Sequence, residues 1–273
     1  MESVDTSKSC RFEELANMFN IGLTAAENPM FSLPLTELLL DEKMLFLIHI
    51  QMKTIKTSAP EASAVSVASG LGYLAYAQQY ALSAYDCAID LSLDNVDVHV
   101  FMKNGYTAVG YTLKRWGERI APAPGLARDG WRQEALHETY SRTLLPILET
   151  ASRVAAIPIR ELWGQLSTGL RYYMRVWSER ASSDCLRHAL EENYRYLREE
   201  LDPSAFGMKV NPYRRDPILT EDAREPGKMI PLKSACCLYY KWEDGDYCFS
   251  CPRLKESERE RRRIAWREAN AAN

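Results

Sequence analysis

The sequence has no long hydrophobic run and no strong excess of charge of either sign. Its most apolar stretches, such as Met44–Ile48, are far too short to cross a bilayer. Residues 1–10 are polar and lack the basic and apolar regions of a signal peptide. The formal net charge of −3 leaves no basic field to hold nucleic acid or an anionic membrane. We therefore expect a soluble, cytoplasmic protein with no integral membrane segment and no nucleic-acid partner.

Nucleotide-binding loops and histidine pairs are also missing. Gly70-Leu71-Gly72 lacks the third glycine and the preceding strand of a dinucleotide-binding loop, so it indicates helix packing. The four histidines are scattered along the chain, unlike the closely spaced histidines of many zinc sites. The sequence therefore gives no sign of a bound flavin or nicotinamide nucleotide.

Most of the chain has the periodicity of helices. Apolar residues recur at helical spacing from Phe12 to Leu23, after Pro34, from Pro60 to about Leu91, and from Trp131 to Leu201. Small residues in the third stretch favour close packing. In the last stretch, Pro146 and Pro158 should divide or kink the helices, because proline cannot donate an N–H in a helix interior.

One segment has the period of a β-strand. From Val96 to Met102 apolar and polar residues alternate, and a second such run follows from Tyr106 to Leu113. Between them stands Asn104-Gly105, a pair that accepts the positive φ angles of a tight hairpin turn. We expect an α+β fold that is predominantly α-helical, with a small β-hairpin or sheet.

Prolines and glycines suggest the boundaries between parts of the chain. Residues 1–120 should form an N-terminal helical region with the hairpin, and residues 121–202 a second helical half. Residues 203–232 hold five prolines without a clear period, which predicts an extended linker. Residues 233–273 contain the cysteine segment and a charged helix with the run Arg261–Arg263. This run could dock an acidic partner, although a solvated charged helix is the default interpretation.

Four of the seven cysteines lie close together near the C-terminus, in the pattern C-C-x10-C-x2-C: Cys236, Cys237, Cys248 and Cys251. An odd number of cysteines spread over a chain of this size does not suggest a disulfide framework. Four soft thiolates favour an iron–sulfur cluster, zinc or copper(I), and four is the number that a [2Fe–2S] centre needs. The sequence therefore predicts a metal or cluster site at the end of the chain.

The spacing favours a [2Fe–2S] cluster among these possibilities. A C-x2-C pair can chelate one metal ion, whereas the side chains of adjacent cysteines tend to diverge. Two irons offer separated positions for such sulfurs, while zinc sites more often use two short-spaced pairs. Glu243–Asp246 has the composition of a turn that would fold the two halves together. A zinc site, a vicinal disulfide or four unrelated thiols remain alternatives.

The motif also resembles a known family. Cys236-Cys237-Leu238-Tyr239-Tyr240, followed by Cys248-Phe249-Ser250-Cys251-Pro252, looks like the C-terminal signature of the FhuF-type ferric siderophore reductases. Ile159–Gln165, with Leu162-Trp163-Gly164, is similar to a segment that this family shares with the C-terminal part of the IucA/IucC siderophore synthetases. Lys233-Ser234-Ala235 stands where members often have arginine and threonine.

The resemblance implies that the four cysteines hold a [2Fe–2S] cluster that reduces a ferric siderophore by one electron and releases Fe(II). Siderophores hold ferrous iron far less tightly than ferric iron, so no nucleophile or acid–base pair is needed. The electron would come from an external ferredoxin-, flavodoxin- or NAD(P)H-reductase-type donor. Other possible functions are iron or redox sensing, siderophore binding without turnover, and a zinc-stabilised relative of the synthetases.

The rest of the chain would then bind the ferric siderophore. Trp163 lies in the family-like segment, and Arg171, Tyr172 and Arg175 follow it at helical spacing. These four are our candidates for substrate contacts. The alternative is that Trp163 belongs to the core and that the two arginines lie on a solvated helix face.

Overall fold

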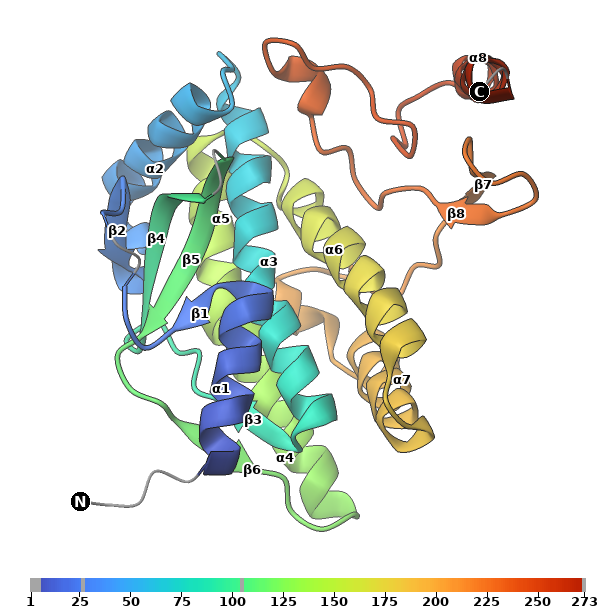
Figure 1. Ribbon diagram of the computed structural model, residues 1–273. Helices are drawn as coiled ribbons and strands as arrows, with labels where there is room; N and C mark the ends of the chain where they lie inside the picture. The colour runs from blue at the N-terminus through green and yellow to red at the C-terminus, as the bar shows by residue number, and fades with distance from the viewer. Residues whose placement is uncertain (1–5, 26–27, 104–105, 272–273) are drawn as a thin grey trace.

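The computed structural model describes residues 6–25, 28–103 and 106–271. Helix α3 (Pro60–Ala84) runs through the middle of the molecule, between a small sheet and a pair of helices (Figure 1). Most of its residues from Ala62 to Ser83 are buried. This burial explains its composition, since a helix surrounded by neighbours needs small and apolar side chains on every face.

The main sheet has the strand order β1-β5-β4-β2. Its strands are β1 (Ile21–Gly22), β2 (Phe31–Pro34), β4 (Val96–Lys103) and β5 (Tyr106–Leu113). Strands β4 and β5 are antiparallel along their whole length, so the predicted hairpin is confirmed. The turn predicted at Asn104-Gly105 lies outside the described residues. Strand β1 pairs with β5 in parallel, which makes the sheet mixed.

Helices make up most of the remaining structure. They are α1 (Thr6–Phe19), α2 (Asp41–Thr54), α4 (Leu126–His137), α5 (Leu145–Val154), α6 (Ile159–Arg180), α7 (Asp184–Glu199) and α8 (Glu256–Ala271), with the short 3-10 turns η1 (Leu35–Leu39), η3 (Pro203–Phe206) and η4 (Tyr239–Lys241) and the π-helical η2 (Glu138–Leu144). Two further strand pairs join β3 (Cys87–Ile89) to β6 (Glu118–Ile120) and β7 (Leu219–Glu221) to β8 (Met229–Pro231). The expected fold class, α+β and predominantly helical, is confirmed.

The third helix is shorter than the sequence predicts. It ends at Ala84 rather than near Leu91, because Asp86 takes a φ of 48° and turns the chain. The following residues form β3, and the side chain of Gln78 accepts the N–H of Ile89 at 2.9 Å. Pairing with β6 therefore outweighs the helical pattern here. Local periodicity cannot reveal that competition, because β6 lies about thirty residues further along the chain.

The chain leaves the helix between α5 and α6, as predicted, and Pro158 stands at the N-cap of α6. Pro146 lies in the first turn of α5, where a missing N–H costs little. Helix α4, the π-helical η2 and α5 follow one another directly along the chain. The division predicted at Pro146 therefore takes the form of a wider π-helical turn before the proline.

Helices α3 and α6 cross closely at two glycines. A Cβ on Gly72 or on Gly169 would overlap the phenol of Tyr76, whose hydroxyl donates to the carbonyl of Leu166 at 3.2 Å. The interpretation of Gly70-Leu71-Gly72 as a packing motif thus agrees with the structure. This contact holds α6 against α3, and the C-terminal cysteine segment in turn packs against α6.

Residues 203–232, which we expected to be an extended linker, contain η3, β7 and β8. Phe206 and Tyr213 are fully buried and pack against Tyr140. The start of the segment is therefore anchored in the core. Strands β7 and β8 then lie beside α8, on the side of α6 that faces away from α3 (Figure 1).

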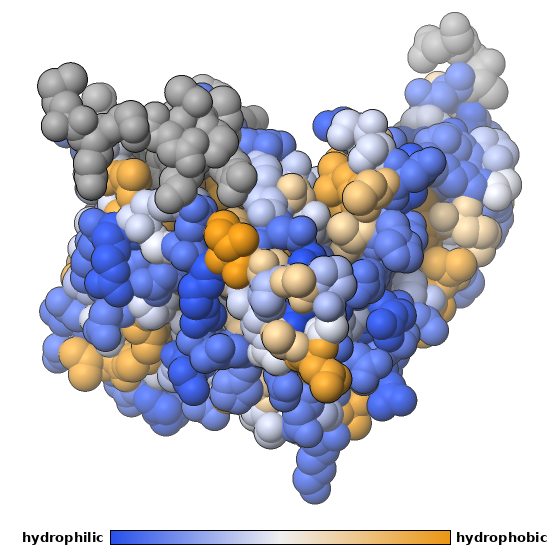
Figure 2. Space-filling model, turned by 90° about the horizontal axis from the view of Figure 1, so that it is seen from below, coloured by the Kyte–Doolittle hydropathy of each residue, from blue (hydrophilic) through white to orange (hydrophobic). Residues whose placement is uncertain are grey.

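In the part of the chain that the structure describes, no helix is both long enough and apolar enough to span a membrane. The lower face of the molecule is mostly hydrophilic, and its hydrophobic residues form small separate patches (Figure 2). The large apolar side chains lie instead in the core around α3 and α6.

Candidate functional site

Helix α6 positions the cysteine segment. Gly164 lies directly against Ala235, where a Cβ on the glycine would overlap the methyl group of the alanine. The side-chain amide of Gln165 donates to the buried carbonyl of Cys236 at 3.1 Å. These contacts come from Leu162–Gln165, the stretch that resembles the siderophore synthetases. The two family-like segments therefore meet in space.

Two special backbone positions fold the segment back on itself. Leu238 follows the cysteine pair with a φ of 53°, a left-handed conformation that is uncommon outside glycine. Gly245 donates its N–H to the carbonyl of Trp242 at 3.1 Å, and a Cβ there would overlap the carbonyl oxygen of Tyr239. The turn predicted at Glu243–Asp246 is thus present, and it needs its glycine.

A buried arginine of α8 holds the second pair of cysteines. Arg259, which is 2% exposed, donates to the carbonyls of Phe249, Cys251 and Leu254 at 3.0, 2.8 and 3.2 Å. The N–H of Cys251 also returns to the carbonyl of Cys248 at 2.9 Å. The C-x2-C turn is therefore held by its own backbone hydrogen bond and by the side chain of Arg259. Sequence reasoning treated α8 only as a charged tail and missed this role.

The four sulfurs form two neighbouring pairs. The Sγ atoms of Cys236 and Cys251 lie 3.5 Å apart, and the thiols of Cys237 and Cys248 lie close enough to shift each other's pKa. Each pair joins one cysteine of the C-C element to one of the C-x2-C element. Cys236 and Cys251 are buried, while Cys237 and Cys248 are half-buried. The structure thus brings together the four cysteines that the sequence singled out.

The surroundings shift the pKa values of three of the thiols in different directions. The hydrogen bond from Cys248 and the nearby Lys233 ammonium lower the pKa of the Cys237 thiol to about 5. The same hydrogen bond raises the pKa of Cys248. Burial raises the pKa of Cys236 to about 11. The lowered pKa of Cys237 favours the thiolate, which is the form that binds metals.

Lys233 is the cation beside these sulfurs. Its Nζ lies 3.1 Å from the Sγ of Cys237. Burial alone would lower the pKa of this ammonium, but the hydrogen bond and charge of Cys237 raise it above its usual value. A half-buried positive charge next to a sulfur ligand stabilises the more negative state of any bound cluster.

The donor set fits two irons better than one zinc ion. A structural zinc needs four ligands around one point, whereas a [2Fe–2S] cluster needs two sulfurs on each iron. The two sulfur pairs match the second requirement. Tyr240 and Tyr247, which lie between the two cysteine pairs in the chain, stack with their ring centres 4.4 Å apart.

These features describe an iron–sulfur protein segment, and comparison with known families supports that class. Residues 234–253 match the family model described as the FhuF 2Fe-2S C-terminal domain. The resemblance of the cysteine motif is thereby confirmed, and the cofactor of this segment is a [2Fe–2S] cluster. The match covers this segment alone. No curated protein matches the chain.

Trp163, a predicted substrate contact, lies in the core. It is 0% exposed, and its indole N–H donates to the carbonyl of Phe206 at 3.0 Å. Its ring packs edge-on against the ring of Phe206. The indole thus anchors the start of the 203–232 segment and has no surface for a ligand, in agreement with the alternative interpretation.

The other three predicted contacts lie further along α6. Arg171 donates to the carbonyl of Arg215 at 3.2 Å, and the Arg175 guanidinium lies 5.6 Å from the ring centre of Tyr172. Tyr172 is 55% exposed. They form a partly exposed surface, which we call the α6 face. Substrate binding by the α6 face stays a prediction.

The basic run of α8 is largely neutralised. Arg261 forms two hydrogen bonds of 2.8 Å with Glu258, and Arg262 pairs with both Glu258 and Asp246. Arg263 is 7% exposed and donates to Thr220 of β7. These arginines therefore join α8 to its surroundings, so the run is less available to an acidic partner than the sequence suggests.

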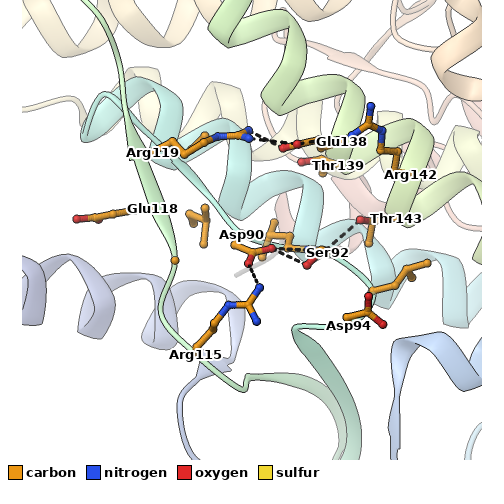
Figure 3. Close-up of a pocket in the computed structure, with 15 residues that line it drawn as sticks. Asp90, Ser92, Asp94, Arg115, Glu118, Arg119, Glu138, Thr139, Arg142 and Thr143 are labelled. Atoms are coloured by element: carbon orange, nitrogen blue, oxygen red, sulfur yellow. Dashed lines mark hydrogen bonds and ion pairs between the residues drawn. The ribbon is translucent and has the colours of Figure 1, made fainter.

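Two cavities show what sequence reasoning missed. A cleft beside the cysteine segment contains Arg160, Lys241 and Arg253 among its lining residues. The sequence could have indicated this cleft, because the basic residues Lys241 and Arg253 lie within and directly after the cysteine motif. A second cavity of about 560 Å³ lies at the opposite end of the molecule, between β3, β6 and η2 (Figures 1 and 3).

Two of the arginines that line that second cavity are paired with carboxylates. Arg115 donates to Asp90 at 3.0 Å, and Arg119 pairs with both carboxylate oxygens of Glu138 (Figure 3). The cavity contains no cysteine and lies far from the cluster segment, so we do not assign it to the redox function.

Proposed function

We propose that this protein is a ferric siderophore reductase in which Cys236, Cys237, Cys248 and Cys251 hold the [2Fe–2S] cluster. The observation that carries the proposal is the arrangement of these four thiols in two pairs, on a segment that matches a 2Fe-2S domain. One pair of sulfurs is buried and the other is half-buried. A redox centre that must accept and pass electrons needs both protection and an approach from the surface.

The proposed reaction needs no nucleophile and no acid–base pair among the surrounding side chains. When bound, the cluster supplies one electron, so that Fe(III) in the siderophore becomes Fe(II), and an external donor replaces that electron. The hard oxygen ligands of a siderophore hold Fe(II) weakly, which completes the release. The protein must therefore hold the ferric complex near the cysteines and expose a docking surface for a donor of the ferredoxin, flavodoxin or NAD(P)H-reductase type.

Several residues of the chain would support this task. Lys233 places a positive charge next to Cys237 and so favours acceptance of an electron. Arg259 and Gln165 hold the backbone of the two cysteine elements through the carbonyls of Cys251 and Cys236. A rigid setting of this kind lowers the reorganisation that accompanies electron transfer.

Anaerobic reduction of the purified protein, followed by mixing with a panel of ferric siderophores, tests the proposal. We expect the visible spectrum of the oxidised protein to return while an Fe(II) chelator in the solution gains colour. The panel should contain hydroxamate, citrate-based and catecholate complexes. Reoxidation by none of them would argue for the sensing or binding function instead. A colourless zinc protein would argue for a relative of the synthetases.

A further inference from the structure

A cleft of about 510 Å³ opens directly beside the cysteine segment. The turn between α5 and α6 forms one wall with Ala155–Pro158, and the start of α3 forms another with Pro60 and Glu61. The cysteine segment closes the cleft with Leu238, Lys241 and Arg253. The three elements meet at the upper end of the molecule in Figure 1. The volume falls in the usual range of ligand pockets, roughly 300–1,000 Å³.

The cleft is lined by residues that lie close to the cysteines in the chain. Leu238 follows Cys237 in the chain, and the backbone N–H of Arg253 points at the Sγ of Cys251 at 3.4 Å. A molecule in the cleft would therefore lie next to the cluster ligands. The α6 face with Arg171 begins about 16 Å further along the helix axis from Arg160.

Positive charge exceeds negative charge in the cleft. Its charged side chains are Arg160, Lys241 and Arg253 against Glu61 and Glu161. Lys241 is held by Glu61, and Arg160 lies 3.6 Å from Glu161. Arg253 reaches the hydroxyl of Tyr240 at 3.3 Å and forms no carboxylate ion pair within 4 Å among the described residues.

Two further features favour an anion. The side chain of Arg160 is 71% exposed, so it can turn from Glu161 toward a ligand at little cost. Helices α3 and α6 both begin at this cleft, and helix N-termini carry partial positive charge. The arginines supply planar, multiple donors that match carboxylate and catecholate oxygens.

We propose that this cleft binds the ferric siderophore and selects complexes of net negative charge, with Arg160 and Arg253 as the contacting residues. This inference rests on the proposed function and names the substrate class of that same site. Anionic complexes are those whose carboxylate or catecholate groups leave the ferric complex with excess negative charge. Neutral and cationic hydroxamate complexes would gain no binding energy from the positive charge of Arg253, which forms no carboxylate ion pair among the described residues.

The test measures binding without electron transfer. Gallium(III) has the charge and coordination chemistry of Fe(III) but is not reduced under these conditions. Calorimetry of the oxidised, cluster-containing protein would use the gallium complexes of a citrate-based siderophore, a triscatecholate and a cationic trishydroxamate. The variants are Arg160→Gln with Arg253→Gln, Arg171→Gln with Arg175→Gln, and the control Arg187→Gln with Arg195→Gln. Each double variant removes two positive charges.

We expect the two anionic complexes to bind the unmodified protein more tightly than the cationic one. The Arg160/Arg253 variant should weaken anionic binding by about tenfold or more, and added salt should weaken it in the unmodified protein. The control should bind as the unmodified protein does. Unchanged anionic affinity in the Arg160/Arg253 variant overturns the assignment, as does a loss confined to the Arg171/Arg175 variant.

Reduction assays separate this inference from the proposed function. If the reduced protein passes electrons to ferric siderophores while the Arg160/Arg253 variant binds anionic gallium complexes normally, the reductase stands and the cleft is wrong. If the reduced protein passes electrons to none, the reductase itself is wrong. Absence of binding by every gallium complex overturns the cleft assignment directly.

Discussion

The side-chain amide of Gln165 donates to the carbonyl of Cys236 at 3.1 Å, across 71 positions of sequence. Next to it, Gly164 packs against Ala235. The synthetase-like stretch of α6 is thus the platform of the cysteine motif, and a change on one should be felt by the other. This relationship leads to the first of four predictions.

Gly164→Ala should weaken the docking of the cysteine segment, because the new methyl group would overlap that of Ala235. Overpacking at such a contact costs about 1–3 kcal/mol of stability. We expect a lower melting temperature and faster loss of visible absorption in the presence of an iron chelator. Combining Gly164→Ala with Ala235→Gly should restore much of both, because the second change removes the obstructing methyl group.

Gly130→Ala is the matched control. Gly130 lies in α4, and no atom stands within 4 Å of the position that its Cβ would take. Alanine in a helix interior is more stable than glycine by about 0.5–1 kcal/mol. The control should therefore raise the melting temperature slightly and leave the cluster untouched. Equal behaviour of Gly130→Ala and Gly164→Ala would contradict the platform.

Arg259→Met should loosen the turn that carries Cys248 and Cys251. The change removes the donor to three loop carbonyls, and each buried carbonyl left unpaired costs about 1–3 kcal/mol. Hydrogen exchange should rise in residues 248–254, and the cluster should be lost faster. Arg261→Met, at a side chain 73% exposed, should change stability by no more than about 1 kcal/mol. Unaltered exchange in the Arg259 variant would show that the loop holds itself.

Lys233→Gln should make the reduction potential of the cluster more negative. Reduction adds a negative charge, and the Lys233 ammonium 3.1 Å from Cys237 stabilises it. Potentiometric titration with optical detection measures the shift, and Lys233→Arg should largely preserve the potential. Lys228→Gln, an exposed lysine paired with Glu225, is the control. A potential that does not move in Lys233→Gln would mean that solvent screens this charge.

Each of the four cysteines should be needed for the cluster. Cys236→Ser, Cys237→Ser, Cys248→Ser and Cys251→Ser should each lose or strongly perturb the visible and electron paramagnetic resonance spectra. Cys185→Ser should leave both spectra unchanged, because Cys185 is exposed on α7, away from the segment. Full retention of the spectrum in any of the four variants would remove that cysteine from the ligand set.

The sequence predicted those parts of the protein that depend on neighbouring residues. The β4–β5 hairpin, the close packing of α3 and the proline before α6 follow from alternation, residue size and the chemistry of proline. The four cysteines could be identified because their spacing alone restricts the possible metals. The turn at Gly245 was visible in the same way.

The remaining features depend on contacts between distant parts of the chain. The end of α3 at Ala84 is decided by the pairing of β3 with β6, which local periodicity does not contain. Arg259 looks like any other charge in a basic helix until its three carbonyl partners are placed around it. Trp163 looked like a ligand contact because of its motif, yet its burial follows from Phe206 and Tyr140.

Metal and sulfide analysis of protein purified without oxygen tests the central claim most directly. The account predicts about two irons and two acid-labile sulfides per chain, with brown colour that bleaches on reduction. Zinc in place of iron, or a colourless protein without labile sulfide, would contradict it.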